Sequence, residues 1–466
     1  MIYLYTLLWI KHLKYNKMSE ETIINTGFEE VLEMKRKLLG NSIEKFKDLG
    51  DDNCSEDSIK VKLFFLIQWI LMGSITGIVV GAVGAVFYHA IVFATKFRTN
   101  HDFIIFLLPF AGLFIVFMYR SCKDYEDRGT NLVIKSIQSG ENLPLIKAPL
   151  IFISTTVTHL FGGSTGRESA ALQMGGSLGY NIGKLFKLNE GNSKIITMCG
   201  MSAAFSALFG TPMTAAFMAM ELESVGIMYY SALFPCVLSA LIANFVAKNM
   251  GVAAEIFVVN ITYDFSPAKA LATGALAILC AVLSVFFCQS LKFAGKNYKK
   301  LLPNPYVRVF VGGVIVVALT FISGSRYYNG AGMNVIEMAI EGKAPYLAFL
   351  FKIIFTAFTL GAGYKGGEIV PALYVGATFG CLFSNIFGFD SALCASIGMG
   401  ALFCGVTNCP ISSLFICFEL FGFKAMPFYL FAVALSYTFS GYHSLYSSQK
   451  IVYSKFHNKY INRPTK

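Results

Sequence analysis

Long apolar runs without Asp, Glu, Lys or Arg alternate with short polar segments along most of the chain. The runs cover residues 63–95, 103–119, 148–166, 195–220, 226–247, 270–291, 309–325, 353–364, 369–389, 391–418 and 425–442. One membrane crossing by a helix needs about 20 apolar residues. Several runs exceed that length and others fall short of it, so the pattern predicts long tilted helices mixed with half-helices.

Composition supports a membrane protein. The 466 residues are 55% hydrophobic and 14% charged, whereas a soluble domain is about 25% charged. We therefore predict an all-α polytopic membrane protein that contacts the lipid bilayer. The net charge of +11 comes from basic residues at the ends of apolar runs and in the tail, so it indicates topology and no nucleic acid partner is expected.

The two ends of the chain are expected to be cytoplasmic. The apolar stretch at residues 1–10 is too short to span and lacks a cleavage pattern, so it is not a signal peptide, and Met18 is an alternative start to Met1. Residues 1–60 are predicted to be a cytoplasmic segment with an amphipathic helix near 28–39. Residues 449–466 carry basic residues and no acid, which predicts a basic cytoplasmic tail.

A glycine-rich break interrupts the apolar pattern at residues 162–170, which read Gly-Gly-Ser-Thr-Gly-Arg-Glu-Ser-Ala. The break places Glu168 at membrane depth, where an ionisable residue marks an ion pathway or a proton relay. Glycines let the backbone leave the helix, and a new helix starting near Arg167 presents its positive end to an anion. Such broken helices occur in transporters and channels, where they line a cavity.

The sequence also contains a weak internal repeat. A Gly, a Pro twelve positions later and a Glu nine positions after the Pro occur at 200, 212 and 221 and again at 398, 410 and 419. The glycines at 166, 175 and 179 are matched by glycines at 367, 376 and 380. We therefore predict two transmembrane repeats, residues 61–250 and 251–448, with the ion site at their interface.

Cysteines and histidines give no sign of a metal site or a cofactor. Nine of the eleven cysteines lie singly in apolar runs without a C-x-x-C pair, so we interpret them as small core residues. His159 lies mid-span, where helix packing is the favoured interpretation. Glu221 and Glu419 occupy equivalent positions of the repeat, and a role at a helix end is favoured for both.

These residues resemble motifs of the CLC family of chloride channels and proton-coupled anion antiporters. Residues 166–170 resemble the G-[KR]-E-G-P motif, residues 367–371 resemble the G-x-F-x-P motif, and Leu-Tyr-Ser at 445–447 resembles the late tyrosine site. The resemblance covers residues 61–448. It implies two inverted helical repeats per subunit and a homodimer in which each subunit holds its own pore.

The resemblance also implies roles for individual residues. Glu168 would be the gate and the proton-transfer group, and Tyr446 would donate its hydroxyl to the central anion. The backbone amides near Ile369 and Val370 would hold the anion at a helix N-terminus. The implied anion-binding residues are Thr130, Asn131, Gly166, Arg167, Ser169, Ile369, Val370 and Tyr446.

Several departures from the family pattern narrow the resemblance to its fluoride-exporting branch. The G-S-G-I-P motif falls at 129–133 without its serine and proline, and the internal glutamate of chloride antiporters falls at Leu222. Residues 148–164 and 173–178 resemble that branch, although Val370 stands where the branch often has threonine. No regulatory nucleotide-binding domain is expected after the membrane part.

The expected function is export of fluoride across the plasma membrane in exchange for protons. Fluoride is small and strongly hydrated, so a site must offer close donors such as Thr130, Asn131, backbone amides and ring edges such as that of Phe161. A chloride/proton antiporter or a voltage-gated-type chloride channel is the alternative. A serine hydrolase is disfavoured, because the G-x-S-x-G match at 162–166 follows a helix-like run, and no enzyme activity is expected.

Overall fold

Helices make up nearly all of the regular structure in the computed structural model, which describes residues 59–124, 128–257 and 266–466. The amphipathic helix predicted near 28–39 and the choice between Met1 and Met18 lie outside the described residues. Residues Trp69–Lys466 form one compact unit. That unit contains every candidate site residue named above.

Two series of helices follow one another along the chain. The first comprises α3 (Ile59–Asn100), η2 (Asp102–Leu107), α4 (Leu108–Ser121), α5 (Thr130–Ser139), α6 (Lys147–Leu160), α7 (Glu168–Leu185), α8 (Glu190–Phe209), α9 (Pro212–Glu221), η3 (Tyr230–Ala232) and α10 (Leu233–Asn249). The second comprises α11 (Pro267–Leu301), α12 (Pro305–Ile322), α13 (Met333–Ile340), α14 (Ala348–Ala362), α15 (Ile369–Phe387), α16 (Ser391–Thr407), α17 (Pro410–Phe421) and α18 (Met426–Phe439). Within the described residues each series therefore holds eight α-helices. The proposed repeat boundary at 250–251 falls between α10 and α11.

Two of the uncharged runs are each divided into two helices. Run 195–220 is split between α8 and α9, where Gly210 has a φ of 71° and Pro212 begins the next helix. Run 391–418 is split in the same way between α16 and α17, where Asn408 has a φ of 57° and Pro410 follows. A left-handed residue ends a helix and proline favours its first turn. These local signals turn two long runs into half-helices.

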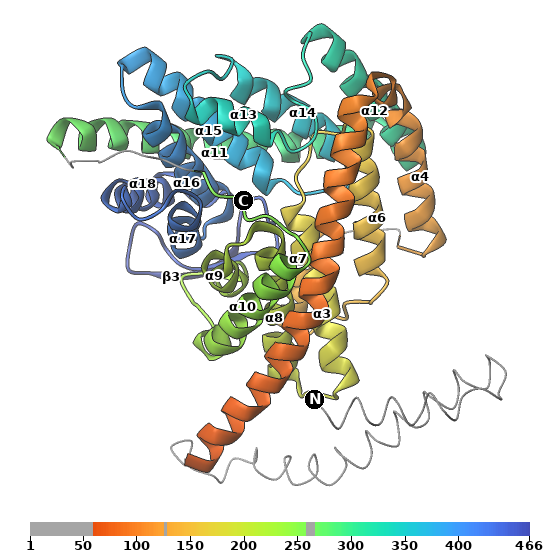
Figure 1. Cartoon of the computed structure of the whole chain (residues 1–466), viewed down its shortest axis with the longest axis vertical. Helices are drawn as coiled ribbons and strands as arrows, with labels where there is room; N and C mark the ends of the chain where they lie inside the picture. Colours follow the sequence, from red (N-terminus) through yellow and green to blue (C-terminus); the bar gives the residue numbers. More distant parts are fainter. Residues whose placement is uncertain (1–58, 125–127, 258–265) are drawn as a thin grey trace. The chain divides into compact units, whose positions relative to one another are not determined.

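Glutamates at the ends of α9 and α17 cap each other's helices. Glu419, in α17, accepts hydrogen bonds from the backbone N–H of Met213 and Thr214 at 2.8 Å each. Glu221, in α9, accepts one from the backbone N–H of Ser412 at 2.8 Å. The two helices lie beside one another (Figure 1). The helix-end role predicted for both glutamates is confirmed, since each satisfies N–H groups that a helix leaves unpaired.

Glycines allow the helix that follows each break to pack closely on the next helix. A Cβ on Gly175 in α7 would overlap the carbonyl oxygen of Gly200 in α8, and a Cβ on Gly376 in α15 would overlap that of Gly398 in α16. The same contact thus occurs at equivalent positions of the two halves. Any larger side chain there would separate the helices that position the site.

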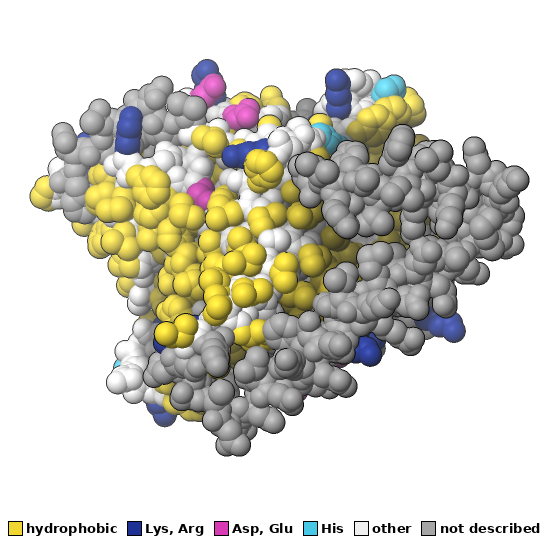
Figure 2. Space-filling model, turned by 60° about the horizontal axis from the view of Figure 1, so that its bottom comes forward, with side chains coloured by type: hydrophobic (Ala, Val, Ile, Leu, Met, Phe, Trp, Pro, Cys, Tyr) yellow, Lys and Arg dark blue, Asp and Glu magenta, His cyan; other side chains and the backbone are white. Residues whose placement is uncertain are grey.

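The surface suits a lipid environment. Six described segments are long and apolar enough to cross a membrane, namely Val61–Asn100, Asp102–Ser121, Tyr230–Asn249, Pro267–Leu301, Pro305–Ile322 and Ile369–Phe387. Large apolar side chains such as Phe110, Phe117, Val282 and Phe321 are exposed on these helices. Figure 2 shows apolar side chains across the middle of one face, with charged side chains toward an edge. Exposed apolar area of this extent is expected where lipid covers the protein.

The tail departs from the prediction of an all-α chain. Strands β1 (Ser224–Val225), β2 (Lys450–Tyr453) and β3 (Tyr460–Pro464) form a small sheet in the order β1-β2-β3. The basic tail is therefore partly ordered. Lys455 donates hydrogen bonds to Asn408 Oδ1 at 2.6 Å and to the Tyr437 carbonyl at 2.8 Å. This basic residue therefore contributes to the packing of the tail against the helices.

The cysteines behave as small core residues, as predicted. Those in the apolar runs are buried and form no disulfide among the described residues. Within the same residues, no group of three or more histidine, cysteine, aspartate or glutamate side chains could hold a metal ion.

Candidate functional site

Two loops that interrupt the helices, one from each half, meet at a short antiparallel bridge. The N–H of Gly166 donates to the Gly367 carbonyl at 2.6 Å, and the N–H of Gly367 donates to the Gly166 carbonyl at 2.7 Å. Helix α7 begins at Glu168 and α15 begins at Ile369, each two residues after its bridging glycine. The bridge therefore brings two helix N-termini together, which favours negative charge between them.

Glu168 lies at this meeting point, and its side chain is fully buried. Its Oε2 accepts hydrogen bonds from the backbone N–H of Arg167 at 3.0 Å and of Val370 at 3.2 Å. Its Oε1 has no hydrogen-bond partner within the part of the chain that the structure describes. The carboxylate therefore uses the backbone donors that a small anion would use, so an anion and Glu168 would compete for them.

Glu168 borders a cavity of about 680 Å³, which we call the Glu168 cavity. Its lining includes Arg98, His159, Arg167, Glu255, Asn329 and Val370. A second cavity of about 250 Å³, the Tyr446 cavity, is lined among others by Thr130, Asn131, Gln173, Glu368 and Tyr446. Among the described residues, the two linings have no member in common. Glu168 thus faces one cavity, and the predicted anion-binding hydroxyls of Thr130 and Tyr446 face the other.

Arg167 is turned toward the Glu168 cavity and forms an ion pair with Glu255. Its guanidinium also lies over the rings of Tyr88 and Phe209, 5.0 Å and 5.6 Å from their centres. Part of its positive charge is therefore balanced by Glu255. Glu255 was not predicted from the sequence, because nothing in its local sequence connects it with the loop at residues 162–167.

The Tyr446 cavity is lined by the buried Tyr446, and the buried hydroxyl of Ser169 lies beside it. The hydroxyls of Tyr446 and Ser169 are buried and have no hydrogen-bond partner among the described residues. Ser169 lies near both Tyr446 and Glu368. Thr130 Oγ1 accepts a hydrogen bond from Gln173 Nε2 at 3.3 Å. The hydroxyl proton of Thr130 therefore remains available for another acceptor. Buried donors are normally satisfied, so these hydroxyls are suited to an anion.

Asn131 is placed differently from Thr130, although the two are neighbours. Its side-chain oxygen accepts hydrogen bonds from the backbone N–H of Ser448 at 2.9 Å and from the Ser447 hydroxyl at 3.4 Å. These residues directly follow Tyr446. Asn131 therefore holds the segment that carries Tyr446, and it also lines the Tyr446 cavity.

The structure thus divides the sequence-predicted residues into two groups that meet at the bridge. Gly166, Arg167, Glu168, Ile369 and Val370 surround the bridge itself. Thr130, Asn131 and Tyr446 border the Tyr446 cavity, and Ser169 lies between the two groups.

Two buried residues of the site region, Glu368 and Lys352, were not predicted from the sequence. Glu368 directly precedes α15 and lines the Tyr446 cavity. Its position inside the motif at 367–371 was the available signal. Lys352 stands at the edge of the uncharged run 353–364, which suggests a residue at the membrane surface, yet it is fully buried. It donates to the carbonyls of Gly330 and Tyr328 at 2.6 and 3.2 Å, which compensates its burial.

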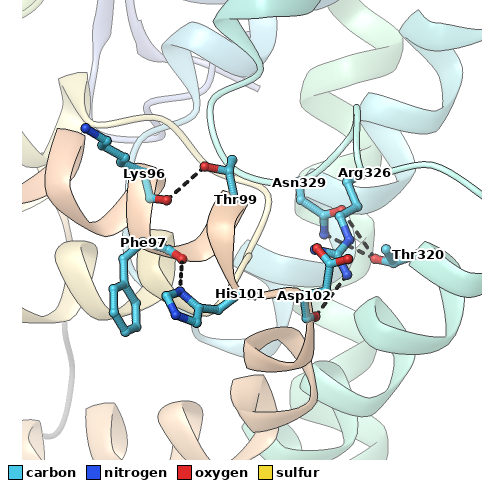
Figure 3. A network of polar contacts seen from close by, with 8 residues as sticks. All are labelled: Lys96, Phe97, Thr99, His101, Asp102, Thr320, Arg326 and Asn329. Atoms are coloured by element: carbon cyan, nitrogen blue, oxygen red, sulfur yellow. Dashed lines mark hydrogen bonds and ion pairs between the residues drawn. The ribbon is translucent and has the colours of Figure 1, made fainter.

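The segment between α12 and α13 covers the Glu168 cavity, and Figure 3 shows how it is held. Asn329 donates from Nδ2 to the Gly162 carbonyl at 2.9 Å and to the Thr320 hydroxyl at 3.1 Å. Arg326 forms an ion pair with Asp102 at the start of η2. These contacts fix the covering segment to the glycine-rich loop and to the first half of the chain.

Ser164 does not have the setting of a hydrolase nucleophile. The segment before it is helix α6, whereas the G-x-S-x-G turn of hydrolases follows a strand. Its hydroxyl lies 3.1 Å from the hydroxyl of Thr356, and its backbone N–H donates to Thr359 at 3.1 Å. Both contacts join the loop to α14.

Comparison with known proteins agrees with this architecture. The family model described as "Voltage gated chloride channel" matches residues 111–441. A chloride/fluoride channel protein of Pseudomonas syringae pv. tomato is 32% identical over 400 residues, which cover 84% of this chain and 88% of the relative. The crystal structure of a CLC-type fluoride/proton antiporter superposes with a TM-score of 0.80 at 28% identity, covering 85% of this chain and all of that one.

A slow cyanobacterial Cl⁻/H⁺ antiporter has the same fold, with a TM-score of 0.69 at 19% identity over 80% of this chain and 94% of that one. The chain therefore has the CLC fold, which is built from broken and half helices. Members of the family are channels and transporters. The chain belongs to the CLC family of voltage gated chloride channels and anion/proton antiporters.

Proposed function

We propose that this protein exports fluoride in exchange for protons, with Glu168 as both the gate and the proton carrier. The observation that carries the proposal is the buried Glu168 carboxylate bound to the N–H of Val370. An anion that takes this N–H must displace the carboxylate, and protonation removes the charge that holds the carboxylate there. Anion and proton therefore compete through one side chain, which is the basis of exchange.

The proposed anion route runs from the Tyr446 cavity past the bridge to the Glu168 cavity. The hydroxyls of Thr130 and Tyr446 in the Tyr446 cavity, and that of Ser169 beside it, donate to the anion. At the bridge the backbone N–H groups near Gly166, Ile369 and Val370 take over, with Arg167 adding positive charge. Asn131 contributes to the site by holding the segment that carries Tyr446, and its side chain also lines the Tyr446 cavity.

Fluoride is the proposed anion because the site combines several close donors in a small space. A strongly hydrated ion needs its water shell replaced by short hydrogen bonds, and hydroxyl and amide groups provide these. Hydrogen fluoride enters cells as a neutral acid and dissociates inside. An inward proton gradient can therefore drive fluoride out. The fluoride/proton antiporter and the chloride/fluoride channel among the similar proteins support this choice.

The proposed setting is the plasma membrane, with both termini in the cytoplasm and with two copies of the chain forming a homodimer. The Tyr446 cavity then faces the cytoplasm and the Glu168 cavity faces outward. Residues 1–60, 61–250, 251–448 and 449–466 are the proposed cytoplasmic segment, two repeats and tail. No enzyme activity, cofactor or nucleic acid partner is part of the proposal.

A chloride/proton antiporter or a chloride channel is the second candidate. Val370 favours it, because its side chain adds no hydroxyl donor beside the N–H that binds Glu168. The cyanobacterial Cl⁻/H⁺ antiporter shares the fold as well.

The deciding experiment uses purified protein in liposomes loaded with either fluoride or chloride. Efflux is recorded with an ion-selective electrode while external pH is followed. Fluoride efflux that is faster than chloride efflux and accompanied by proton uptake supports the proposal. Chloride efflux as fast as fluoride efflux refutes fluoride selectivity, and fluoride efflux without proton movement indicates a channel.

A further inference from the structure

His159 is a buried histidine to which the proposed anion and proton route assigns no role. It lies in the last turn of α6, is 1% exposed and lines the Glu168 cavity. Its Nε2 is 3.3 Å from the Gly166 carbonyl oxygen. A carbonyl can only accept, so Nε2 carries the proton in this contact. The neutral ring therefore presents a lone pair at Nδ1.

Two side-chain atoms around the Glu168 cavity are buried without a hydrogen-bond partner in the described part of the chain. They are Nδ1 of His159 and Oε1 of Glu168. Arg98, Arg167 and Lys352 are close enough to His159 to interact electrostatically, but arginine and lysine offer donors only. The other carboxylate of the cavity, that of Glu255, is paired with Arg167. Nδ1 is therefore an available acceptor among groups that mostly donate.

A protonated Glu168 needs such an acceptor. Its present partners are the N–H groups of Arg167 and Val370, and neither can accept the proton of a carboxylic acid. The loop places the two groups close to the same residue. The Gly166 carbonyl faces Nε2 of His159, and a Cβ on Gly166 would overlap Oε2 of Glu168.

We propose that Nδ1 of His159 accepts the hydrogen bond of protonated Glu168 and so holds the proton on the side of the Glu168 cavity. The inference rests on the proposed exchange of fluoride for protons. The proton stays on the carboxyl oxygen in this contact and leaves to water in the cavity, so His159 is a positioning residue. The imidazole ring accepts this hydrogen bond in its neutral form, so no further positive charge is added beside Arg98, Arg167 and Lys352.

His159→Gln separates this role from a purely structural one. The glutamine amide nitrogen can replace Nε2 as the donor to Gly166, while the lone pair at Nδ1 is lost. The loss of one hydrogen bond between neutral groups should lower the proton affinity of Glu168 roughly two- to tenfold, and with it the proton-to-fluoride ratio at pH values where protonation of Glu168 is limiting. The pH of half-maximal proton flux should fall by roughly 0.3 to 1 unit for the same reason.

Two control experiments distinguish loss of the Nδ1 acceptor from a general effect of replacing a histidine. His89→Gln is the matched control, because Nε2 of His89 also donates to a backbone carbonyl, that of Met250 at 2.8 Å, on an exposed surface. In a Glu168→Gln background no proton is carried at position 168, so adding His159→Gln should cause no further change in pH dependence. If His159→Gln does not fold, as judged by size-exclusion chromatography, His159→Asn gives the converse test, because its side-chain oxygen can replace the Nδ1 acceptor while the donor to Gly166 is lost. The pH profile of His159→Asn should then stay close to that of the wild type, and a shifted profile would overturn the inference.

Suppose that the proton-to-fluoride ratio and the pH profile are unchanged in His159→Gln but altered in His159→Ala. The histidine would then act only through its hydrogen bond to the Gly166 carbonyl. That result overturns the inference and leaves the proposed function intact. A wild-type protein that moves fluoride without protons refutes the proposed exchange itself, and the inference with it. The wild type measured alone therefore separates the two failures.

Discussion

Replacing Glu168 with glutamine should abolish proton movement and leave anion flow less restricted. A glutamine side chain has nearly the shape of glutamate but cannot take up or release a proton in the accessible pH range. In the wild type, Oε2 accepts hydrogen bonds from the N–H of Arg167 and Val370. Both bonds are strengthened by the negative charge, and glutamine removes that charge.

The size of the effect follows from these two bonds. A hydrogen bond to a charged group contributes about 1.5–3 kcal/mol, and one between neutral groups about 0.5–1.5 kcal/mol. Loss of charge therefore weakens each bond by about 1–1.5 kcal/mol, and both together by about 2–3 kcal/mol. The side chain should leave the bridge about 30- to 150-fold more readily.

The assay is the same pair of recordings in liposomes, with fluoride efflux and external pH followed together. We expect no proton uptake in Glu168→Gln, and fluoride efflux that no longer depends on a pH gradient. Glu419→Gln is the matched control, because Glu419 also accepts two backbone N–H bonds at a helix start but lines neither cavity. Proton flux at the wild-type rate in Glu168→Gln would refute the assignment of the gate.

Three further changes test other parts of the site. Glu221→Gln should leave the proton-to-fluoride ratio intact, because Glu221 caps α17; complete loss of coupling would instead assign it an internal proton role. Thr130→Ala should reduce fluoride transport roughly ten- to a hundredfold more than chloride leak, the value of one hydrogen bond to an anion, and Thr130→Ser should raise chloride passage; equal effects on both anions, measured by efflux, would contradict its role in selectivity. Thr465→Val should lower the free energy of unfolding in detergent by about 1 kcal/mol and weaken fluoride affinity, because the Thr465 hydroxyl donates to the Tyr446 carbonyl at 2.6 Å. Thr465→Ser should retain both properties. A valine variant with wild-type fluoride affinity would show that the tail does not position Tyr446.

Much of the fold could be predicted because its signals are local. Membrane helices follow from uncharged runs, and helix breaks follow from Gly210, Pro212 and Pro410 within a few residues of the break. The repeat was visible because equivalent glycines and glutamates keep the same spacing in both halves. Glu168 could be singled out because an acidic residue in a spanning region is costly and therefore rare.

The partners of these residues could not be predicted, because they come from distant parts of the chain. Glu255 reaches Arg167, Ser448 reaches Asn131, and Lys352 reaches the carbonyl of Gly330 only after the helices have packed. The sequence predicts only a basic cytoplasmic tail, yet β2 pairs with β1 through Ser224 and Lys450. Strand pairing between such distant segments leaves no periodic pattern in either of them.

Hydropathy and residue spacing are enough to predict that this chain crosses a membrane in broken helices, that its two halves repeat, and that Glu168 lies at membrane depth near a helix start. These properties depend on hydropathy and on backbone preferences of single residues. Helix packing in three dimensions brings the two breaks together at Gly166 and Gly367 and places Glu168 against the N–H of Val370 from the other half. It also placed His159 beside the same cavity. The reason is physical: a hydrogen bond depends on distance and direction in space, and these are set by the packing of helices that lie far apart in the chain.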